Sequence, residues 1–337
     1  MKPRVLVIKL GSLGDILQIS PVIDAMNDHR DSVIDVLTFD EHRPLFEYHP
    51  NICQIISLKR SFMSLLKIIA RIICHRYDIG LNLHRSMALD ALMFFCFVKY
   101  RVGFSSPEKK TVFLQASVPF NLSISRHHRY LSMVECVAHS PFKMSDYGLS
   151  YYKSPKAQLD VSFKGEPYVV IAPFGGHNRY STMPSRVWPE YMALIELILA
   201  GFPTTTVVLT GGPEDCRSLE KMKSSFGDRV HVFLGNFDAL SMVLESALCF
   251  IGNDSFPLFM AIASQCKALA IFGPTDSRLI LEPYQNTYFV QSEVSCSPCY
   301  NPLEGVNNVA YHCPFEFKCM TTISAQKVFD KFKEICI

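Results

Sequence analysis

The sequence lacks both a strong excess of one charge and a long uninterrupted apolar run. Its formal net charge is only +2 over 337 residues, and it has no basic-aromatic recognition motif, so we expect no nucleic-acid partner. The apolar stretches around 61–74 and 86–98 are interrupted by charged residues and fall short of the roughly 20 residues that a membrane-spanning helix needs. We therefore expect no transmembrane helix.

A secretion signal and a disulfide framework are also absent. Residues 1–4 lead directly into an apolar strand, without the apolar segment and small-residue cleavage site of a signal peptide. Eight of the 12 cysteines are scattered along the chain in mostly apolar surroundings, which is typical of reduced thiols. Both observations favour a cytoplasmic protein, and 337 residues are enough for two domains of ordinary size.

The chain opens with a strand, a glycine-containing loop and a helix. Val5–Ile8 are four consecutive aliphatic residues, which favour a parallel strand covered on both faces, and apolar residues at spacings of three and four follow up to Met26. Between them lie Gly11, Ser12 and Gly14, at the end of the strand where open α/β sheets bind ligands. The glycines would allow a positive φ and a close backbone approach, so we expect an acceptor-side or phosphate loop here.

Asp15 follows this loop and is the candidate general base. A carboxylate beside the free backbone amides of a helix start is well placed to take a proton. The alternative is that Asp15 only caps the helix, because Asp is a favoured N-cap residue. Pro21, which follows Ser20, could begin a second helix and leave residues 15–19 as one short turn.

The first half continues with alternating strands and helices. We predict strands at 33–38, 52–58, 77–83 and 101–104, and helices at 41–48, 59–76 and 131–138. The helix at 59–76 is basic and amphipathic. It either lies with one face on the sheet and the other in water, or it contacts an anionic membrane surface or an anionic acceptor. Basic and imidazole side chains follow the strands and could line an acceptor site: His84, Arg85, His127, His128 and Arg129.

A second series of strands and helices follows a polar, turn-rich stretch at 140–165, where we place a domain boundary. Strands are predicted at 168–173, 206–210, 230–233, 249–252 and 268–272, with helices after Trp188, at 240–247 and at 258–264. This alternation predicts a second doubly wound parallel sheet, so that two α/β domains face each other across a cleft. Neither glycine loop has the dinucleotide fingerprint with its downstream acidic residue, which argues against a dehydrogenase.

Several of these segments together resemble glycosyltransferase family 9, the heptosyltransferases of lipopolysaccharide core assembly. They occur in the family's order over nearly the whole chain: Lys9–Asp15 with Pro21, Arg101–Phe104, Ser181–Pro189, Gly211–Glu214, Gly252–Ser255 and Phe272–Asp276. The resemblance implies the GT-B fold of two Rossmann-like domains. Residues 1–150 would bind the acceptor, residues 166–322 would bind the nucleotide-sugar donor, and a helix at 323–337 would pack back on the first domain.

The resemblance also implies an activity. It is the transfer of a sugar, most often heptose from ADP-heptose, to a hydroxyl of a glycan or glycolipid acceptor, with inversion at the anomeric carbon. Asp15 matches the family's general base. The donor-binding positions that the resemblance implies are Ser181, Thr182, Arg186, Glu214 or Asp215, Asp254 and Ser255. A helix N-terminus after Ser255 would bind the pyrophosphate without a metal, so no cofactor is required for catalysis. We expect the enzyme to work at the inner face of the bacterial membrane.

Two positions depart from the family pattern. The family usually reads Asp-Thr/Ser-Gly and then, three residues after that glycine, a His, whereas this chain has Phe256 and Phe259 there. Phe256 adds bulk where a glycine lets the backbone reach the phosphates, and loss of the His removes one donor. The rival hypothesis is therefore a divergent, non-catalytic GT-B protein that binds a nucleotide or a glycan.

One cluster of cysteines lies near the C-terminus. Cys296 and Cys299 form a C-x-x-C pair, and Cys313 and Cys319 follow. Four thiolates could bind a structural zinc or iron ion tetrahedrally. Reduced thiols or a disulfide are the alternatives, and no catalytic role is implied.

Overall fold

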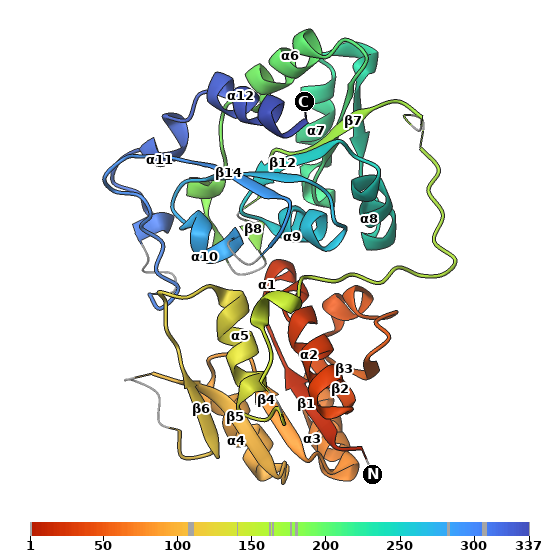
Figure 1. Ribbon diagram of the computed structural model, residues 1–337, viewed down its shortest axis with the longest axis vertical. Coiled ribbons are helices and arrows are strands. Elements are labelled where there is room, and N and C mark those ends of the chain that lie inside the picture. The colour runs from red at the N-terminus through yellow and green to blue at the C-terminus, as the bar shows by residue number, and fades with distance from the viewer. Residues whose placement is uncertain are drawn as a thin grey trace. The chain divides into compact units, whose positions relative to one another are not determined.

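The computed structural model divides the chain into two units, Met1–Ser154 and Pro155–Ile337 (Figure 1). The structure describes all residues except 1, 107–110, 140, 162, 164, 176, 179–180, 282–283, 305–308 and 337. Of residues 177–178, 181–182 and 309 it describes the backbone only. Each unit contains one six-stranded sheet whose neighbouring strands are parallel.

The first sheet is built around the opening strand of the sequence. Its strands are β1 (Arg4–Ile8), β2 (Val33–Phe39), β3 (Ile52–Leu58), β4 (Ile79–Asn82), β5 (Tyr100–Ser105) and β6 (Ala116–Pro119). Their order is β3-β2-β1-β4-β5-β6, so β1 lies in the middle, and Val5 pairs with Ile34 on one side and Ile79 on the other. The strand order reverses between β1 and β4, which is where open α/β sheets bind ligands.

Helices cover this sheet on both faces. They are α1 (Leu13–Leu17), α2 (Ser20–Arg30), η1 (Asp40–Leu45), α3 (Phe62–His75), α4 (Met87–Phe95), α5 (Arg126–Glu135) and η2 (Met144–Asp146). α3 and α4 bury Ile68, Ile72 and Met93 in one cluster with Leu6 and Ile8 of β1, whereas α2 packs against α5. α2 begins at Ser20 with a proline in its first turn, as the position of Pro21 predicts.

The second sheet repeats the same topology. Its strands are β7 (Tyr168–Ala172), β10 (Thr206–Thr210), β11 (Val230–Phe233), β12 (Cys249–Asn253), β13 (Ala268–Phe272) and β14 (Thr287–Gln291), in the order β11-β10-β7-β12-β13-β14. A separate antiparallel pair is formed by β8 (His177–Asn178) and β9 (Ser181–Thr182). The strand order reverses between β7 and β12, and this edge is the expected ligand site of the second unit.

The helices of the second unit begin with η3 after β9 and end with α12 at the C-terminus. They are η3 (Pro184–Arg186), α6 (Tyr191–Gly201), η4 (Pro213–Asp215), α7 (Cys216–Lys223), η5 (Gly227–Arg229), α8 (Phe237–Glu245), α9 (Phe256–Ala263), α10 (Ser277–Leu281), η7 (Val309–Tyr311), α11 (Lys318–Thr321) and α12 (Ala325–Cys336). α12 lies beside α6 (Figure 1). Its residues Val328, Phe329 and Phe332 share a buried cluster with Ile195 and Ile198 of α6. The apolar face of α12 is therefore buried in the second unit. That residues 323–337 also pack on the first domain stays a prediction.

The predicted alternation of strands and helices is confirmed in both halves. The edge strands β6 and β14 and the helices α4, α7, α10 and α11 were missed. The helix predicted at 41–48 is the shorter 3₁₀ helix η1, and the helix predicted at 131–138 begins earlier, at Arg126. Among the described residues, no helix is long and apolar enough to cross a membrane.

Candidate functional site

Asp15 is held at the carboxyl edge of the first sheet by a tight loop. Ser12 is the N-cap of α1 and Asp15 is the third residue of this helix, so the alternative that Asp15 is the cap is wrong. A Cβ at Gly11 would lie 3.3 Å from Oδ2 of Asp15, so glycine lets the loop backbone lie against the carboxylate. Neither Gly11 nor Gly14 has the positive φ that was expected, and Gly14 lies within α1.

Basic side chains from α5 lie beside this carboxylate. Arg126, the first residue of α5, forms an ion pair with Asp15 although 111 positions separate them. Arg129 is buried, and burial together with the charge of Arg126 lowers its pKa to about 10. The guanidinium groups of Arg129 and Arg85 lie 4.8 Å and 5.4 Å from the ring centre of Phe120. This concentration of positive charge suits an anionic acceptor.

Two further residues near Asp15 were missed by sequence reasoning. Lys9 donates through Nζ to a backbone carbonyl at the end of β4 (3.1 Å) and lies over the ring of Tyr130. His42, in η1, is buried; burial lowers its pKa, and the charges of Glu41 and Asp15 oppose that shift. Lys9 directly follows β1 and begins the family segment Lys9–Asp15, whereas His42 lies in η1, shortly after β2.

His127 does not join this group. Its side chain is buried, with Nε2 lying 3.1 Å from the backbone oxygen of Met144, and burial lowers its pKa to about 4. The backbone amide of His128 and the ring Nδ1 of the same residue both contact Oγ of Ser125, the N-cap of α5. These two histidines therefore hold α5 in place, and the positive charge beside Asp15 comes from the arginines of the same helix.

In the second unit, Arg186 and Asp254 meet at the carboxyl edge of the sheet. Nη2 of Arg186 lies 3.4 Å from Oδ2 of Asp254, and its guanidinium group lies 5.0 Å from the ring centre of Tyr300. Nε of Arg186 is buried and has no hydrogen-bond partner in the described part of the chain. A buried cationic donor without a partner is suited to an anionic ligand.

Asn253, the last residue of β12, fixes the loop that carries Arg186. Its Oδ1 accepts hydrogen bonds from the backbone N of Trp188 (3.2 Å) and the hydroxyl of Tyr191 (2.9 Å), and its Nδ2 donates to the carbonyl of Pro173 (3.2 Å). Sequence reasoning missed this role. Asn253 therefore links the carboxyl ends of β7 and β12, the two neighbouring strands between which the strand order reverses.

The N-terminus of α9 is available to an anion at this edge. Ser255 is its N-cap but makes no capping bond with its side chain. Pro257 has no N–H, and the N–H of Leu258 donates to the carbonyl of Ser255 (3.1 Å), so Phe256 supplies the backbone amide of the first turn that an anion could contact. Gly175 has a φ of +152°, and a Cβ there would lie 2.9 Å from Cβ of Ser255. Only glycine lets the loop after β7 approach Ser255 this closely.

The two departures from the family pattern occupy different environments. Phe259 is buried among the core residues of α9, whereas Phe256 is half-buried and its ring contacts Phe237 (centroids 5.2 Å apart). Each ring therefore has an apolar partner or a place in the core.

The other predicted donor residues lie on loops at the same end of the sheet. Ser181 and Thr182 make up β9, and the structure describes their backbone but not their side chains. Asp215 closes the turn after β10, because its Oδ2 accepts the backbone N–H of Gly212 (2.9 Å). Glu214 is exposed and is the carboxylate of this pair that remains for a ribose.

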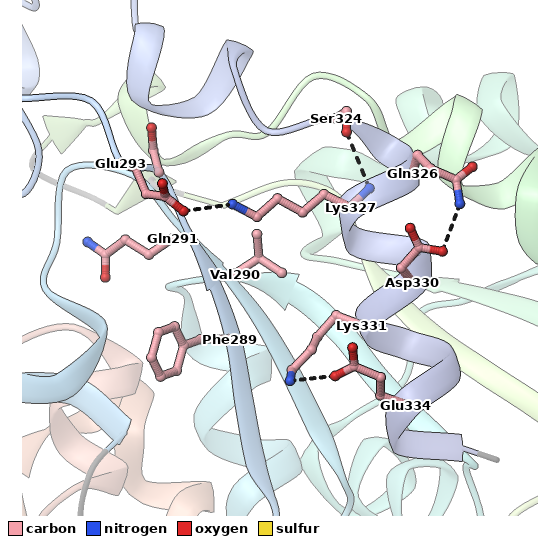
Figure 2. A pocket seen from close by; sticks show the side chains of 11 residues that line it. Phe289, Val290, Gln291, Glu293, Ser324, Gln326, Lys327, Asp330, Lys331 and Glu334 are labelled. Atoms are coloured by element: carbon pink, nitrogen blue, oxygen red, sulfur yellow. Dashed lines mark hydrogen bonds and ion pairs between the residues drawn. The ribbon is translucent and has the colours of Figure 1, made fainter.

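Two cavities lie in the second unit. One, of about 760 Å³, lies between β14 and α12 (Figure 2). It contains the ion pairs Lys327–Glu293 (3.3 Å) and Lys331–Glu334 (2.7 Å), and no predicted site residue lines it. The other, of about 320 Å³, is mostly apolar and is lined by Phe174 and Trp188 next to the Arg186 loop. The second cavity therefore adjoins the predicted donor residues.

The four C-terminal cysteines influence one another without forming a metal site. Burial first, and then the charges of Cys299, Cys313 and Cys296, raise the pKa of Cys319 to about 12. In the described part of the chain, no group of three or more His, Cys, Asp or Glu side chains is arranged to hold a metal ion. The described cysteines form no disulfide.

Comparison with known proteins identifies similar sequences over most of the chain. The family model described as "Glycosyltransferase family 9 (heptosyltransferase)" matches residues 65–309. The Escherichia coli protein "Lipopolysaccharide heptosyltransferase 3" is 24% identical over 304 residues, which cover 81% of this chain and 84% of that protein. The similarity therefore extends through both units.

Solved structures share the fold. E. coli ADP-heptose lipopolysaccharide heptosyltransferase II superposes with a TM-score of 0.75 at 15% identity, covering 99% of this chain and 98% of that one. The dodecameric iron-containing heptosyltransferase TibC, solved in complex with ADP-D-beta-D-heptose, gives a TM-score of 0.62 at 15% identity and covers 99% of this chain and 76% of that one. The GT-B expectation for the fold is confirmed.

Proposed function

The chain belongs to glycosyltransferase family 9, and we propose that it transfers heptose from ADP-heptose to a hydroxyl group of a lipopolysaccharide-core or similar glycan. Two similar proteins support the choice of sugar and nucleotide: an E. coli lipopolysaccharide heptosyltransferase, and TibC in its complex with ADP-D-beta-D-heptose. The observation that carries the proposal is at Arg186, whose buried Nε has no hydrogen-bond partner among the described residues and whose ion pair with Asp254 places it beside the start of α9.

In the proposed reaction Asp15 is the general base. Its carboxylate takes the proton of the acceptor hydroxyl while the oxygen attacks the anomeric carbon, and the bond from that carbon to the diphosphate oxygen breaks. The nucleoside diphosphate leaves from the opposite face, so the configuration inverts. Arg126 and Arg129 would orient an anionic acceptor beside the base, because their charges lie next to Asp15 or next to each other.

The second unit is the proposed donor domain. Arg186 and the N-terminus of α9 would stabilise the additional negative charge that develops on the β-phosphate oxygen as the bond to the anomeric carbon breaks, and this requires no metal. Ser181, Thr182 and Ser255 would add hydroxyl contacts to the phosphates, and Glu214 would hold the ribose. Asp254 would keep Arg186 in place through its 3.4 Å ion pair.

Phe256 and Phe259 bear on the rival hypothesis of a non-catalytic binding protein. Phe259 is buried in the core of α9, so this substitution removes a donor without filling the site. Phe256 contacts Phe237, and this contact offers a place for its ring outside the phosphate site. Both observations favour catalysis over the rival.

Calorimetric titration with ADP-heptose tests the donor site directly. We expect the protein to bind ADP-heptose more tightly than UDP or GDP sugars, and Arg186→Ala to lose at least tenfold in affinity, since hydrogen bonds to charged groups contribute about 1.5–3 kcal/mol. Arg278→Ala is the matched control, because Arg278 is an exposed arginine of the same unit paired with Asp276 (2.9 Å). Absence of binding to any nucleotide sugar, in a protein shown to be folded, would contradict the proposed transfer and favour the non-catalytic rival.

We also propose a structural iron or zinc ion at Cys296, Cys299, Cys313 and Cys319. Four thiolates are a donor set that suits either metal, and the charges of the other three thiols reach Cys319. Because no metal-binding arrangement is formed among the described side chains, the thiols would have to move together on binding. Metal analysis of the purified protein and of Cys299→Ser tests this, with Cys136→Ser as the control; a metal content equal in both variants would contradict it.

A further inference from the structure

α3 is apolar on the side that faces away from the sheet as well as on the side that packs against it. Ile68 and Ile72 are the two buried residues of this 14-residue helix. At 3.6 residues per turn, the opposite side carries Phe62, Met63, Leu66 and Ile73. All four are exposed, and Phe62 is 73% exposed. A surface helix normally has polar residues on this side, so the outward face of α3 needs an explanation.

The end of α4 adds aromatic rings to the same side of the unit. Phe95 and Phe97 are 66% and 75% exposed, and the ring of Phe94 lies 5.3 Å from that of Phe95. Phe97 has a φ of +60°, a conformation that favours glycine, yet it carries a large apolar ring into solvent. Because α3 and α4 pack on the same face of the first sheet, their outward sides belong to one surface, which we call the α3–α4 face.

Positive charge accompanies these apolar residues. Residues 59–101 contain eight Lys or Arg and two Asp, whereas the whole chain is nearly balanced at 33 basic and 31 acidic residues. One of the two acidic residues, Asp90, is fully buried. Lys67 and Arg71 are both exposed and flank the apolar side of α3. The α3–α4 face is therefore apolar and bordered by cations.

We propose that the α3–α4 face binds the surface of an anionic lipid bilayer. A helix that lies in the headgroup region of a membrane needs exposed apolar residues on one side and Lys or Arg beside them, and α3 has both. The charge pattern disfavours a second copy of the chain as the partner, because a symmetric contact would bring the same positive charges together. A bilayer rich in anionic lipid complements the face in both charge and polarity.

The position of this face bears on the acceptor, and here the inference rests on the proposed function. α3 and α4 begin just after the carboxyl ends of β3 and β4, so their first residues Phe62 and Met87 lie toward the sheet edge that carries Asp15. A membrane-embedded glycolipid would then present its sugar to the edge of the unit where the base lies.

Co-sedimentation with vesicles tests the proposal. The purified full chain should bind vesicles that contain phosphatidylglycerol, bind pure phosphatidylcholine vesicles much less, and be released by high salt. In the double variant Lys67→Gln/Arg71→Gln, the partition coefficient should fall about fivefold for each lost charge, or about 25-fold together. In Phe95→Ser/Phe97→Ser it should fall about tenfold or more. The matched controls in the second unit, Lys331→Gln and Leu248→Ser, should bind like the native chain.

The possible results separate this proposal from the proposed function. Absence of binding to anionic vesicles, or equal binding by the α3–α4 variants and the controls, overturns it, as does a stable dimer that the two phenylalanine substitutions dissociate. Donor binding by calorimetry is measured on the same variants and should be unchanged, because the proposed donor residues lie in the second unit. Vesicle binding without any nucleotide-sugar binding would support the surface and contradict the proposed function.

Discussion

At the scale of single residues, the decisive contact of the first unit joins two positions far apart in the sequence. The composition of the loop after β1 is enough to predict a carboxylate at the sheet edge, and Asp15 lies there. Its partner Arg126 could not be predicted, because α5 reaches Asp15 only once the sheet has formed. The same holds for Asn253, which reads as an ordinary loop residue until Trp188, Tyr191 and Pro173 are seen around it.

Replacing the proposed base should abolish most of the activity without unfolding the protein. Asp15→Asn keeps the size of the side chain but cannot accept the proton, so kcat should fall about 10²- to 10⁴-fold. Asp146→Asn, an exposed carboxylate of the same unit, is the control and should keep normal turnover. ADP-heptose turnover by both variants provides the measurement, and a kcat for Asp15→Asn close to that of the control would rule out the assignment.

Buried histidine should make the first unit sensitive to acid. The pKa of His127 is about 4 in the folded chain and about 6.5 when unfolded, so between these values the unfolded chain binds the extra proton. The free energy of unfolding should therefore fall as the pH decreases from about 6.5 toward 4. Between pH 7 and about pH 5, His127 alone should account for a loss of about 2 kcal/mol.

Denaturant unfolding of His127→Asn at the two pH values checks this contribution. The variant should lose less stability on acidification than the native chain. The exposed His312 offers a control, because His312→Asn should leave the difference between the two pH values unchanged. If His127→Asn and His312→Asn respond to acid alike, burial does not hold the pKa of His127 down.

At the scale of elements, periodicity was a good guide in the middle of each sheet and at the edge strands β3 and β11, but it missed the opposite edge strands β6 and β14. β1 and β7 are runs of aliphatic residues with neighbours on both sides, and both were predicted. β6 and β14 each pair with a single strand, contain polar residues and are only partly buried, so their sequences carry a weak strand signal. For α12 the amphipathic pattern shows that the helix has an apolar face but does not identify what covers it, and the structure places that face in the core of the second unit.

The core position of α12 predicts a large effect of a single substitution. Phe332 is fully buried beside α6, so Phe332→Ala should destabilise the second unit by about 3–5 kcal/mol. The only tryptophan, Trp188, lies in the same core and donates to the carbonyl of Ile323 (2.8 Å), so its fluorescence reports on this unit. Lys331→Ala, next to it on the solvent side, should leave the fluorescence transition nearly in place. If Phe332→Ala unfolded the first unit while the Trp188 fluorescence stayed native, this packing of α12 would be contradicted.

At the scale of the whole molecule, each of the two units has its own core and its own set of predicted site residues. The apolar cluster of the second unit contains residues from β7 to α12 and none from before Ser154. The predicted donor residues lie in this unit, and the predicted base lies in the other. The family resemblance predicted this division of labour from segments in both halves; the sequence alone could not assign the C-terminal helix to its unit.

Expression of residues 155–337 alone tests that independence. Because the fragment retains the complete core and the Arg186 site, it should fold with native Trp188 fluorescence and bind ADP with the affinity of the full chain. Residues 1–154 alone should show no nucleotide binding. An unfolded 155–337 fragment, with the full chain stable, would show that the second unit depends on the first.

Because α12 is part of the core of the second unit, the two units must finish folding at different times during synthesis. The first unit is complete in the chain by Ser154 and can fold while the rest is being translated. The second unit cannot close until its last helix has left the ribosome, since Phe329, Phe332 and Ile335 are part of its interior. A ribosome that stops before α12 is complete would therefore release a folded first unit joined to an open second unit, a product that quality-control proteases can distinguish from the mature protein.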